Sequence, residues 1–314
     1  MYDQIIDANV NRIGEGLRVI EEYVRFVRSN ESLTKDLSRI RKMVHQAFPQ
    51  QSNYLHSRST GRDVRAKEVP SKRDTVYDLL VANFKRVQEA LRVLEEYANS
   101  AICNECRYDM YDLEQHILLL ATKPVIKKGV YLISDSVETL KQGIDWGCAL
   151  VQLRDKYASK PELLDRAYEV ADYAKNTTVP FIINDFIDIV QLVDADGLHT
   201  GQDDISLVKQ RKLLGEHKII GRTTHSLAQG KLAATEGADY VSVGPIWETP
   251  SKPDRAAIGF DYLEQVNDAL DIPFVAIGGI NDHNIQHVMK FSPHMVGVIR
   301  SYQSTQQWQA LFDD

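Results

Sequence analysis

FIINDFIDIVQLVDADGLHTGQDD, which runs from Phe181 to Asp204, contains two short apolar segments that each stop at acidic and amide side chains. The first segment leads into Asn184 and Asp185, and the second leads into Asp204. A short amphipathic stretch separates them, which is the pattern of a β/α unit. Because strand ends in a (β/α) barrel point into the mouth of the active site, we expect these acidic ends to lie together.

Two carboxylates at matching strand ends can share one hard cation. Mg²⁺ usually takes one or two protein carboxylates and completes its shell with substrate phosphates. Either residue could instead cap the helix that follows it. A cap is the simpler explanation for one Asp, whereas a pair at equivalent positions favours a metal site formed by Asp185 and Asp204.

The same strand-then-helix alternation continues through the second part of the chain. It predicts a compact (β/α)8 TIM barrel over residues 129–314, an α/β fold. The expected strands are Val130–Ser134, Ala149–Leu153, Pro180–Ile183, Ala195–Leu198, Lys218–Gly221, Tyr240–Val243, Pro273–Ile277 and Met295–Ile299.

Basic and phosphate-binding groups follow several of these strands. Arg154 and Lys156 come after the second strand, and alternation places them on the same side as Gln152. Gly278-Gly279 after the seventh strand and Ser301 after the eighth suit the cradle of backbone N–H groups by which such barrels hold phosphate. Lone basic residues are usually surface charge, but here they share one predicted rim with two Asp.

The first part of the chain is duplicated. DANVNRIGEGLRVIEEY (7–23) recurs as VANFKRVQEALRVLEEY (81–97), an offset of 74 residues. Apolar residues at helical spacing make each copy a helix, and a second helical pattern follows each, so we predict an all-α, pseudo-symmetric helical bundle over residues 1–122. Residues 123–128, rich in Pro and Lys, are predicted to form a linker.

Polar residues are duplicated together with the apolar ones. They are Asn9, Arg12, Glu15 and Arg18 in the first copy and Asn83, Arg86, Glu89 and Arg92 in the second. A stripe of this kind is commonly a solvated face, where Glu–Arg pairs contribute only about 0.2–0.5 kcal/mol. Their return in both copies favours a shared ligand site in a polar cleft between the halves.

Composition excludes several classes of protein. Among 314 residues the formal net charge is −7, so a general nucleic-acid binder is not expected. No apolar run has membrane-spanning length, and the first residues do not have the pattern of a signal peptide, so a cytoplasmic location is predicted. Cys103 and Cys106 form a CxxC within a helical pattern, and we interpret it as incidental.

Five motifs together resemble the thiamine-phosphate synthase family: VQLRDK, FIINDFIDI, ADGLHTGQDD, VSVGPIWETPSK and VAIGGI. The resemblance covers residues 129–314. It implies a TIM-barrel enzyme that joins 4-amino-2-methyl-5-hydroxymethylpyrimidine diphosphate to a thiazole phosphate and releases pyrophosphate. It further implies that Mg²⁺ assists a dissociative displacement.

The resemblance also implies roles for individual residues. Asp185 and Asp204 would hold Mg²⁺, and Gln152 and Thr223 would face the pyrimidine. Arg154, Lys156, Asn184 and Lys252 would meet the diphosphate, with Arg154, Lys156 and Lys252 as the catalytic cations. The thiazole phosphate would meet Thr249, Ser251, Gly279, Ile299 and Ser301. Arg300 departs from the small residue that many members carry there.

The duplicated helical region is similar to a domain found fused to this synthase, to which hydroxymethylpyrimidine-phosphate kinase activity is attributed. The resemblance implies a bifunctional enzyme whose first domain uses ATP to make the diphosphate. Three alternatives stay open: a thiazole tautomerase-like barrel, a sugar-phosphate isomerase using His199 and His225, and a first domain that only dimerises or senses a ligand. A homo-oligomer is compatible with each.

Overall fold

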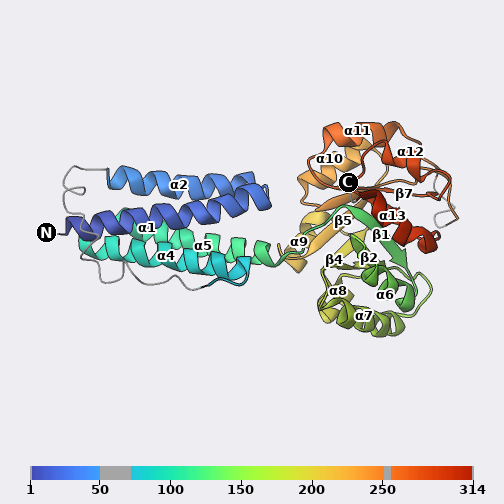
Figure 1. Ribbon diagram of the computed structural model, residues 1–314, viewed down its shortest axis with the longest axis horizontal. Coiled ribbons are helices and arrows are strands. Elements are labelled where there is room, and N and C mark those ends of the chain that lie inside the picture. The colour runs from blue at the N-terminus through green and yellow to red at the C-terminus, as the bar shows by residue number, and fades with distance from the viewer. Residues whose placement is uncertain (1, 50–71, 251–255, 313–314) are drawn as a thin grey trace. The chain divides into compact units, whose positions relative to one another are not determined.

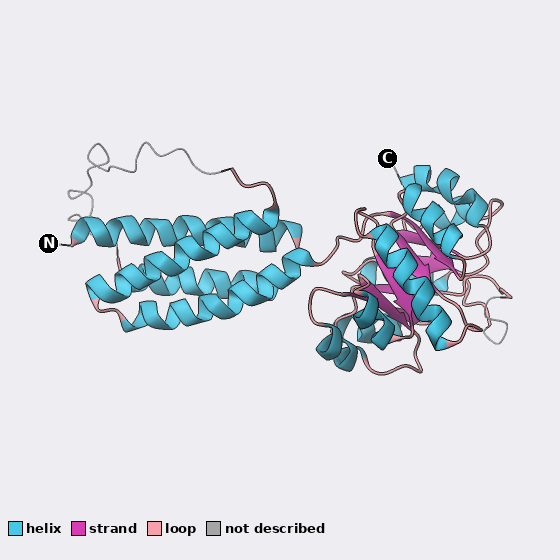
Figure 2. Ribbon diagram, turned by 90° about the horizontal axis from the view of Figure 1, so that it is seen from below, coloured by secondary structure: helices cyan, strands magenta, loops and turns pink. Residues whose placement is uncertain are grey.

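The computed structural model describes residues 2–49, 72–250 and 256–312, which fall into two compact units, residues 1–122 and 123–314. The first unit is helical, and the second carries the described strands (Figures 1 and 2). Residues 123–128, predicted as a linker, belong to the second unit. Lys123 forms an ion pair with Asp239 at 2.7 Å, and His294 Nε2 donates to the Ile126 carbonyl oxygen at 3.1 Å. None of the described helices has the length and apolar character needed to cross a membrane.

The helices of the first unit form a bundle around one apolar core. In chain order they are α1 (Asp3–Glu22), which continues into the π-helical turn η1 (Tyr23–Val27), α2 (Glu31–Ala47), α4 (Val76–Ala98) and α5 (Ala101–Thr122). α1 packs on α2 and α4, and α5 packs on the same two helices. Ile13, Leu17 and Ile20 of α1 are buried at the predicted helical spacing, and their counterparts in α4 are buried with them. The duplicated helical bundle is therefore confirmed.

The first helices of the two copies, α1 and α4, pack antiparallel. The ring of Tyr2 lies 5.2 Å from the ring of Tyr97, at opposite ends of the two sequences. Near the middle of the seam, a Cβ added to Gly16 would come within 2.6 Å of Val87 Cγ2 and 3.3 Å of the Asn83 carbonyl oxygen. The glycine thus lets the two helices approach closely at that point.

The second unit is a closed barrel of eight parallel strands in the order in which they occur in the chain. The strands are β1 (Gly129–Ser134), β2 (Leu150–Leu153), β3 (Phe181–Asn184), β4 (Gly197–Thr200), β5 (Ile219–Thr224), β6 (Tyr240–Val243), β7 (Phe274–Ile277) and β8 (Met295–Val298). The helices are α6 (Val137–Asp145), α7 (Lys160–Ala174), α8 (Ile187–Val193), α9 (Leu207–Leu214), α10 (Leu227–Thr235), α11 (Asp261–Ala269), α12 (Ile285–Met289) and α13 (Thr305–Gln309), with short 3₁₀ turns η3 (Tyr302–Ser304) and η4 (Ala310–Phe312).

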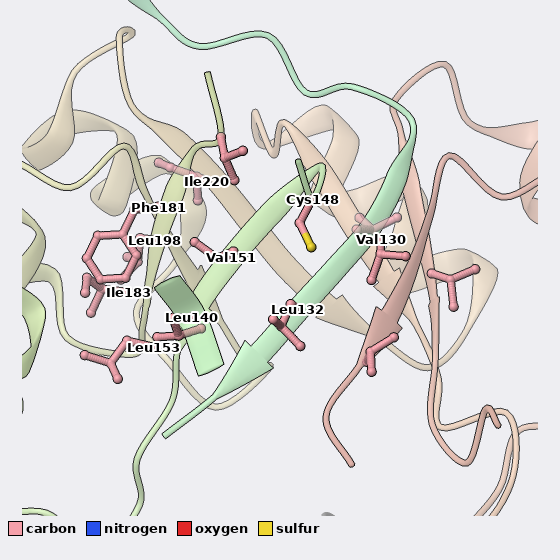
Figure 3. Close-up of a cluster of buried hydrophobic side chains, with 14 of the residues drawn as sticks. Val130, Leu132, Leu140, Cys148, Val151, Leu153, Phe181, Ile183, Leu198 and Ile220 are labelled. Carbon is pink, nitrogen blue, oxygen red and sulfur yellow. The ribbon is translucent and has the colours of Figure 1, made fainter. Parts of the chain in front are cut away.

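Strand alternation divides the barrel into an outer and an inner core. Val130 and Leu132 of β1 point outward and pack with Leu140 of α6 and Val151 of β2, as Figure 3 shows. Tyr131 points inward, where it joins a smaller cluster that fills the barrel. The inner layer is the floor on which the residues at the strand ends are placed.

Two strands differ from their predicted bounds by more than one residue. β4 lies two residues later than predicted, because the Asp196 carboxylate accepts the Phe181 backbone N–H at 2.8 Å and pairing with β3 starts only at Gly197. β5 extends three residues further than predicted, to Thr224, whose hydroxyl hydrogen-bonds to Tyr262 at 2.8 Å. His199 and Thr223 are therefore strand residues with fixed side-chain directions.

Candidate active site

A cavity of about 340 Å³ opens at the carboxyl ends of the barrel strands. Each of the eight strands, or the loop that follows it, contributes to the lining. Two charged lining residues, Glu248 and Arg300, lie in the loops after β6 and β8. Eight of the residues predicted from the sequence line it: Gln152, Arg154, Asn184, Thr223, Thr249, Gly279, Ile299 and Ser301.

A chain of buried hydrogen bonds crosses the floor of the cavity. Gln152 Nε2 donates to the Tyr131 hydroxyl at 2.8 Å, and that hydroxyl lies 2.7 Å from the Tyr240 hydroxyl. His199 continues the chain, with Nδ1 2.9 Å from the Tyr240 hydroxyl and Nε2 3.0 Å from the Thr223 hydroxyl. Each side chain is thereby held in one orientation, which suits recognition of a polar ring.

Sequence reasoning missed the two tyrosines of this chain, which look like ordinary core residues in apolar strands. Burial raises the pKa of Tyr131 and of Tyr240, so both phenols stay protonated and can serve as donors. The Tyr240 ring has room because residue 221 is a glycine. A Cβ at Gly221 would lie 2.1 Å from Tyr240 Cζ. The sequence signal that could have identified them is a tyrosine at an inward-facing position of a predicted barrel strand.

The loop after β2 presents the predicted cations. Asp155 organises it, since its Oδ1 accepts the Tyr157 backbone N–H at 2.8 Å and its Oδ2 pairs with Arg166 at 2.6 Å. Arg154 lines the cavity, whereas Lys156 is exposed and is not among the lining residues. Burial lowers the pKa of Arg154, and the charge of Asp185 opposes that shift, so the two groups are electrostatic neighbours.

The two predicted metal ligands are close enough to interact. Burial raises the pKa of Asp185 and the charge of Asp204 raises it further, while Arg154 and Lys156 act in the opposite direction. Asp185 adopts φ +61°, a left-handed conformation uncommon for a residue other than glycine. Its backbone N–H donates to the His199 carbonyl oxygen at 2.9 Å, which anchors this conformation on β4.

This carboxylate pair fits a magnesium ion that substrate oxygens complete. Within residues 2–49, 72–250 and 256–312, no group of three or more His, Cys, Asp or Glu side chains gathers to hold a metal. Mg²⁺ does not require one, because one or two carboxylates suffice when phosphates and water fill the other positions. The mutual repulsion of Asp185 and Asp204 is the interaction that a shared cation would relieve.

Arg222 supports the loop that carries Asp204. Its guanidinium is buried, with 5% of the residue exposed, and donates to the carbonyl oxygens of Gly201 and, at 3.0 Å, Ile205. Within the loop, the Gly201 backbone N–H donates to Asp204 Oδ2 at 2.7 Å. Arg222 is not among the residues that line the cavity, and its guanidinium binds the acidic loop instead.

Glycines shape the end of the cavity at which the sequence predicts phosphate binding. Gly278 and Gly279 have φ of +102° and +73°, and a Cβ at Gly279 would lie 2.7 Å from Trp247 Cβ. The Trp247 backbone N–H donates to the Gly278 carbonyl oxygen at 3.1 Å, which ties the loop after β6 to the loop after β7. Thr249 follows in the same loop and lines the cavity.

Ser251 and Lys252 lie outside the described residues, so their predicted roles stay predictions. Arg300 is exposed, yet it lines the cavity beside Ser301. The hydroxyl of Ser301 is directed at the Ile280 carbonyl oxygen, 3.5 Å away, across the strand ends β7 and β8. Arg300, the predicted departure from the family pattern, therefore adds a cation to this end of the cavity.

The duplicated residues of the bundle take up different kinds of position. Asn9 and Asn83 are buried, and each amide donates to the carbonyl oxygen four residues earlier at 2.8 Å, which gives the buried amide a partner within its own helix. Arg18 pairs with Glu22 at 2.5 Å, and Arg92 pairs with Glu95 at 2.8 Å.

Arg12, Glu15, Arg86 and Glu89 are exposed. Arg12 donates to the Asn9 side chain at 3.4 Å, and Arg86 borders the close contact at Gly16. The ligand cleft predicted between the halves stays a prediction. Close packing at Gly16 leaves no room for a ligand at that point of the seam.

The CxxC has a packing explanation. Cys103 and Cys106 are fully buried in the bundle core and are not oxidised to a disulfide. Burial raises the pKa of Cys106 to about 11, so its thiolate is suppressed at neutral pH. The two cysteines occupy core positions of α5 that correspond to Leu37 and Ile40 of α2.

Comparison with known proteins assigns a family model to each unit. Residues 124–302 match the model described as thiamine monophosphate synthase, and residues 4–116 match the ThiD2 family. Together the two matches cover most of the chain, and each falls within one of the two structural units.

Similar curated proteins extend over both units. The thiamine-phosphate synthase of Synechocystis sp. is 36% identical across 96% of this chain and 92% of its own length. That of Thermosynechococcus vestitus is 37% identical across 95% of this chain and 89% of its own. Among solved structures, thiamine phosphate pyrophosphorylase from Pyrococcus furiosus aligns with 60% of this chain and 96% of itself, with 26% identity and a TM-score of 0.54.

Proposed function

The chain belongs to the thiamine monophosphate synthase family, and on that premise we propose how its barrel performs the reaction and what its first domain adds. The barrel is a thiamine-phosphate synthase domain. It couples 4-amino-2-methyl-5-hydroxymethylpyrimidine diphosphate to 4-methyl-5-(2-phosphoethyl)thiazole and releases pyrophosphate. The observation that supports the residue assignment is that Arg154 and Asn184 line the cavity, while the charges of Arg154 and Asp204 both act on Asp185, the residue after Asn184.

The difficult step is departure of the diphosphate. The methylene C–O bond breaks and its electron pair leaves with the diphosphate oxygen, while the aminopyrimidine ring delocalises the cation left behind. Arg154 and Lys156 are placed to offset the growing negative charge, and Asn184 can donate to the same group. Preoriented cations in a partly buried site act more strongly than they would in water.

The thiazole phosphate is proposed to bind at the opposite end of the cavity. Gly279, Thr249 and Ser301 line that end, and Arg300 adds a positive charge. The thiazole nitrogen is already a nucleophile, so its lone pair forms the new C–N bond without a general base. Gln152 and Thr223, held by the floor chain, would orient the pyrimidine for that attack.

Magnesium is the proposed metal, held by Asp185 and Asp204. When bound, it supplies further positive charge to the diphosphate oxygens. The two carboxylates would hold the ion, and Lys156, whose charge acts on Asp185, would add a further positive charge for the diphosphate. Small-molecule substrates are therefore the partners of this site, which needs no nucleic acid or membrane surface.

We propose that the first domain is a hydroxymethylpyrimidine-phosphate kinase. Its match to the ThiD2 family and its two arginine-bearing copies support this. In the proposed step, the terminal phosphoryl group of ATP is transferred to a phosphate oxygen of the pyrimidine monophosphate. ADP leaves, and the product is the diphosphate that the barrel consumes.

One assay tests both activities in the full chain. With the pyrimidine diphosphate, thiazole phosphate and Mg²⁺, thiamine phosphate should form and ATP should have no effect. With the pyrimidine monophosphate instead, product should form only when ATP is added. Failure of the second reaction alone would reject the kinase and favour a bundle that only dimerises or senses a ligand. A tautomerase-like barrel would form no thiamine phosphate in either reaction.

A further inference from the structure

A polar groove runs along the first half of the bundle, between α1 and α2. It is a shallow, widely open depression with a volume of about 410 Å³. Its lining consists of Val10, Asn11, Gly14, Glu15, Arg18, Arg41 and His45. The groove therefore lies within one copy of the duplication and not between the two halves.

Gly14 keeps this groove open. A glycine inside a helix costs roughly 0.5–1 kcal/mol relative to alanine, so it usually has a packing reason. Gly16 has one, because Val87 would clash with its Cβ at 2.6 Å. A Cβ on Gly14 would meet nothing within 4 Å. Close packing does not explain Gly14, whereas the need for open space beside α1 does.

The duplication shows that this face of the helix has diverged. Asp7, Asn11, Gly14 and Arg18 fall at i, i+4, i+7 and i+11, so they form one stripe of α1. Adding the 74-residue offset gives the corresponding stripe of the second copy, which consists of Val81, Lys85, Gln88 and Arg92. Three of these four positions differ, whereas Glu15, which also lines the groove, is unchanged, as are Asn9, Arg12 and Leu17 nearby.

In the second copy the equivalent space is filled. Gln88 is buried and donates to Glu114 at 2.8 Å, and Lys85 donates to Gln88 at 3.2 Å. Tyr111 covers the neighbouring arginine, with its hydroxyl 3.0 Å from Arg107 Nη1. Side chains thus occupy in one copy what Gly14 leaves open in the other.

The second helices of the two copies keep one ion pair. Glu21 accepts from Ser38 and Arg41, at 2.8 and 2.6 Å. Glu95 accepts from Asn104 and Arg107, at 2.9 and 3.1 Å, so residues 38 and 41 correspond to 104 and 107, an offset of 66. By that offset His45 corresponds to Tyr111, the residue that covers Arg107.

The groove thus combines three basic side chains with two groups able to recognise a ring. Arg41 is preoriented by Glu21 and shares the α2 wall with His45, and Arg18 lies on the α1 wall opposite. Guanidinium groups suit phosphate oxygens. The Glu15 carboxylate can accept a hydrogen bond from an exocyclic amine, and the Asn11 amide can donate one to a ring nitrogen.

We propose that the α1–α2 groove is the binding site for the phosphate monoester of an aminopyrimidine, the substrate class of the proposed kinase. The inference rests on that proposed function and locates its substrate in the first copy alone. The second copy is then the structural partner that retains the shared core and ion pair.

The test is calorimetric titration of the full chain with 4-amino-5-hydroxymethyl-2-methylpyrimidine phosphate, in saturating thiamine phosphate to occupy the barrel. Gly14→Gln introduces the side chain of the second copy, and Arg18→Ala removes a wall cation. Both should weaken binding at least tenfold. The matched control Lys85→Asn places the first-copy residue on the opposite side of the bundle, and its affinity should stay within twofold of wild type.

Measurements of Tm and of ATP-dependent product formation distinguish a folding defect from loss of the groove site and from absence of kinase activity. The Tm of Gly14→Gln should be no lower than that of wild type, because glutamine has a higher helix propensity than glycine and its side chain enters open space. If the Tm does fall, the affinity of Arg18→Ala, a change at an exposed residue, decides the test. Wild-type affinity in both groove variants would overturn the groove assignment even if ATP-dependent product still formed. Intact groove binding without ATP-dependent product would instead reject the kinase and keep the site. Equal affinity for inorganic phosphate and the pyrimidine phosphate would refute recognition of the ring.

Discussion

Replacing Arg222 by methionine should loosen the acidic loop and weaken the metal site from a distance. The change removes a buried guanidinium that donates to the carbonyl oxygens of Gly201 and Ile205. Hydrogen bonds from a charged donor contribute about 1.5–3 kcal/mol each. Part of that loss is offset because a buried cation no longer has to be desolvated. We therefore expect a net loss of about 2–4 kcal/mol.

The expected loss can be measured in two ways. For a domain the size of residues 123–314, 1 kcal/mol shifts Tm by about 2–4 °C, so the barrel transition should fall by roughly 10 °C. Asp204 lies in the released loop, so the affinity of the protein for Mg²⁺ with pyrophosphate, measured by calorimetry, should fall at least tenfold. Arg222→Lys keeps the charge and one donor and should recover part of both effects. Wild-type Mg²⁺–pyrophosphate affinity in Arg222→Met, whatever its Tm, would refute the positioning role.

Three further predictions concern single side chains. Asp185→Asn should abolish most turnover yet raise the Tm of the metal-free protein at pH 7, because the raised pKa of Asp185 makes its ionisation oppose folding. That gain should vanish as pH falls below about 4, where the carboxyl is protonated in both states, and a constant gain across pH would contradict it. Lys156→Ala should weaken pyrophosphate binding tenfold or more and leave thiazole phosphate binding unchanged; an equal loss for both ligands would place Lys156 elsewhere. Because burial raises the pKa of Cys106 to about 11, iodoacetamide should not label the native bundle at pH 8, and rapid labelling would show that the core opens.

Sequence periodicity was sufficient for the architecture. Apolar runs four to six residues long, each followed by a helical pattern, predict a parallel α/β fold, and eight such units favour a closed barrel; the duplicated 17-residue segment indicated the bundle. The chemistry of the strand ends was equally visible. Gln152, Arg154, Asn184 and Thr223 line the cavity because alternation and strand ends determine which way such residues point.

Which residues pair across the fold could not be obtained from local pattern. The start of β4 depends on a side chain of Asp196 that reaches β3, and the role of Arg222 depends on a loop some twenty residues earlier in the chain. The floor chain through Tyr131 and Tyr240 likewise joins strands that are distant in sequence. These contacts are long-range, and a single sequence carries no local signal for them.

The bundle shows the same division between local and long-range information. Its sequence revealed one repeat with an offset of 74, because α1 and α4 retain many identical residues. The offset of 66 between α2 and α5 emerged only from the ion pairs of Arg41 and Arg107, since the loops between the helices differ in length. The open groove at Gly14 could be recognised only once its filled counterpart was known, because packing between helices, and not the composition of either helix, determines whether a face is covered.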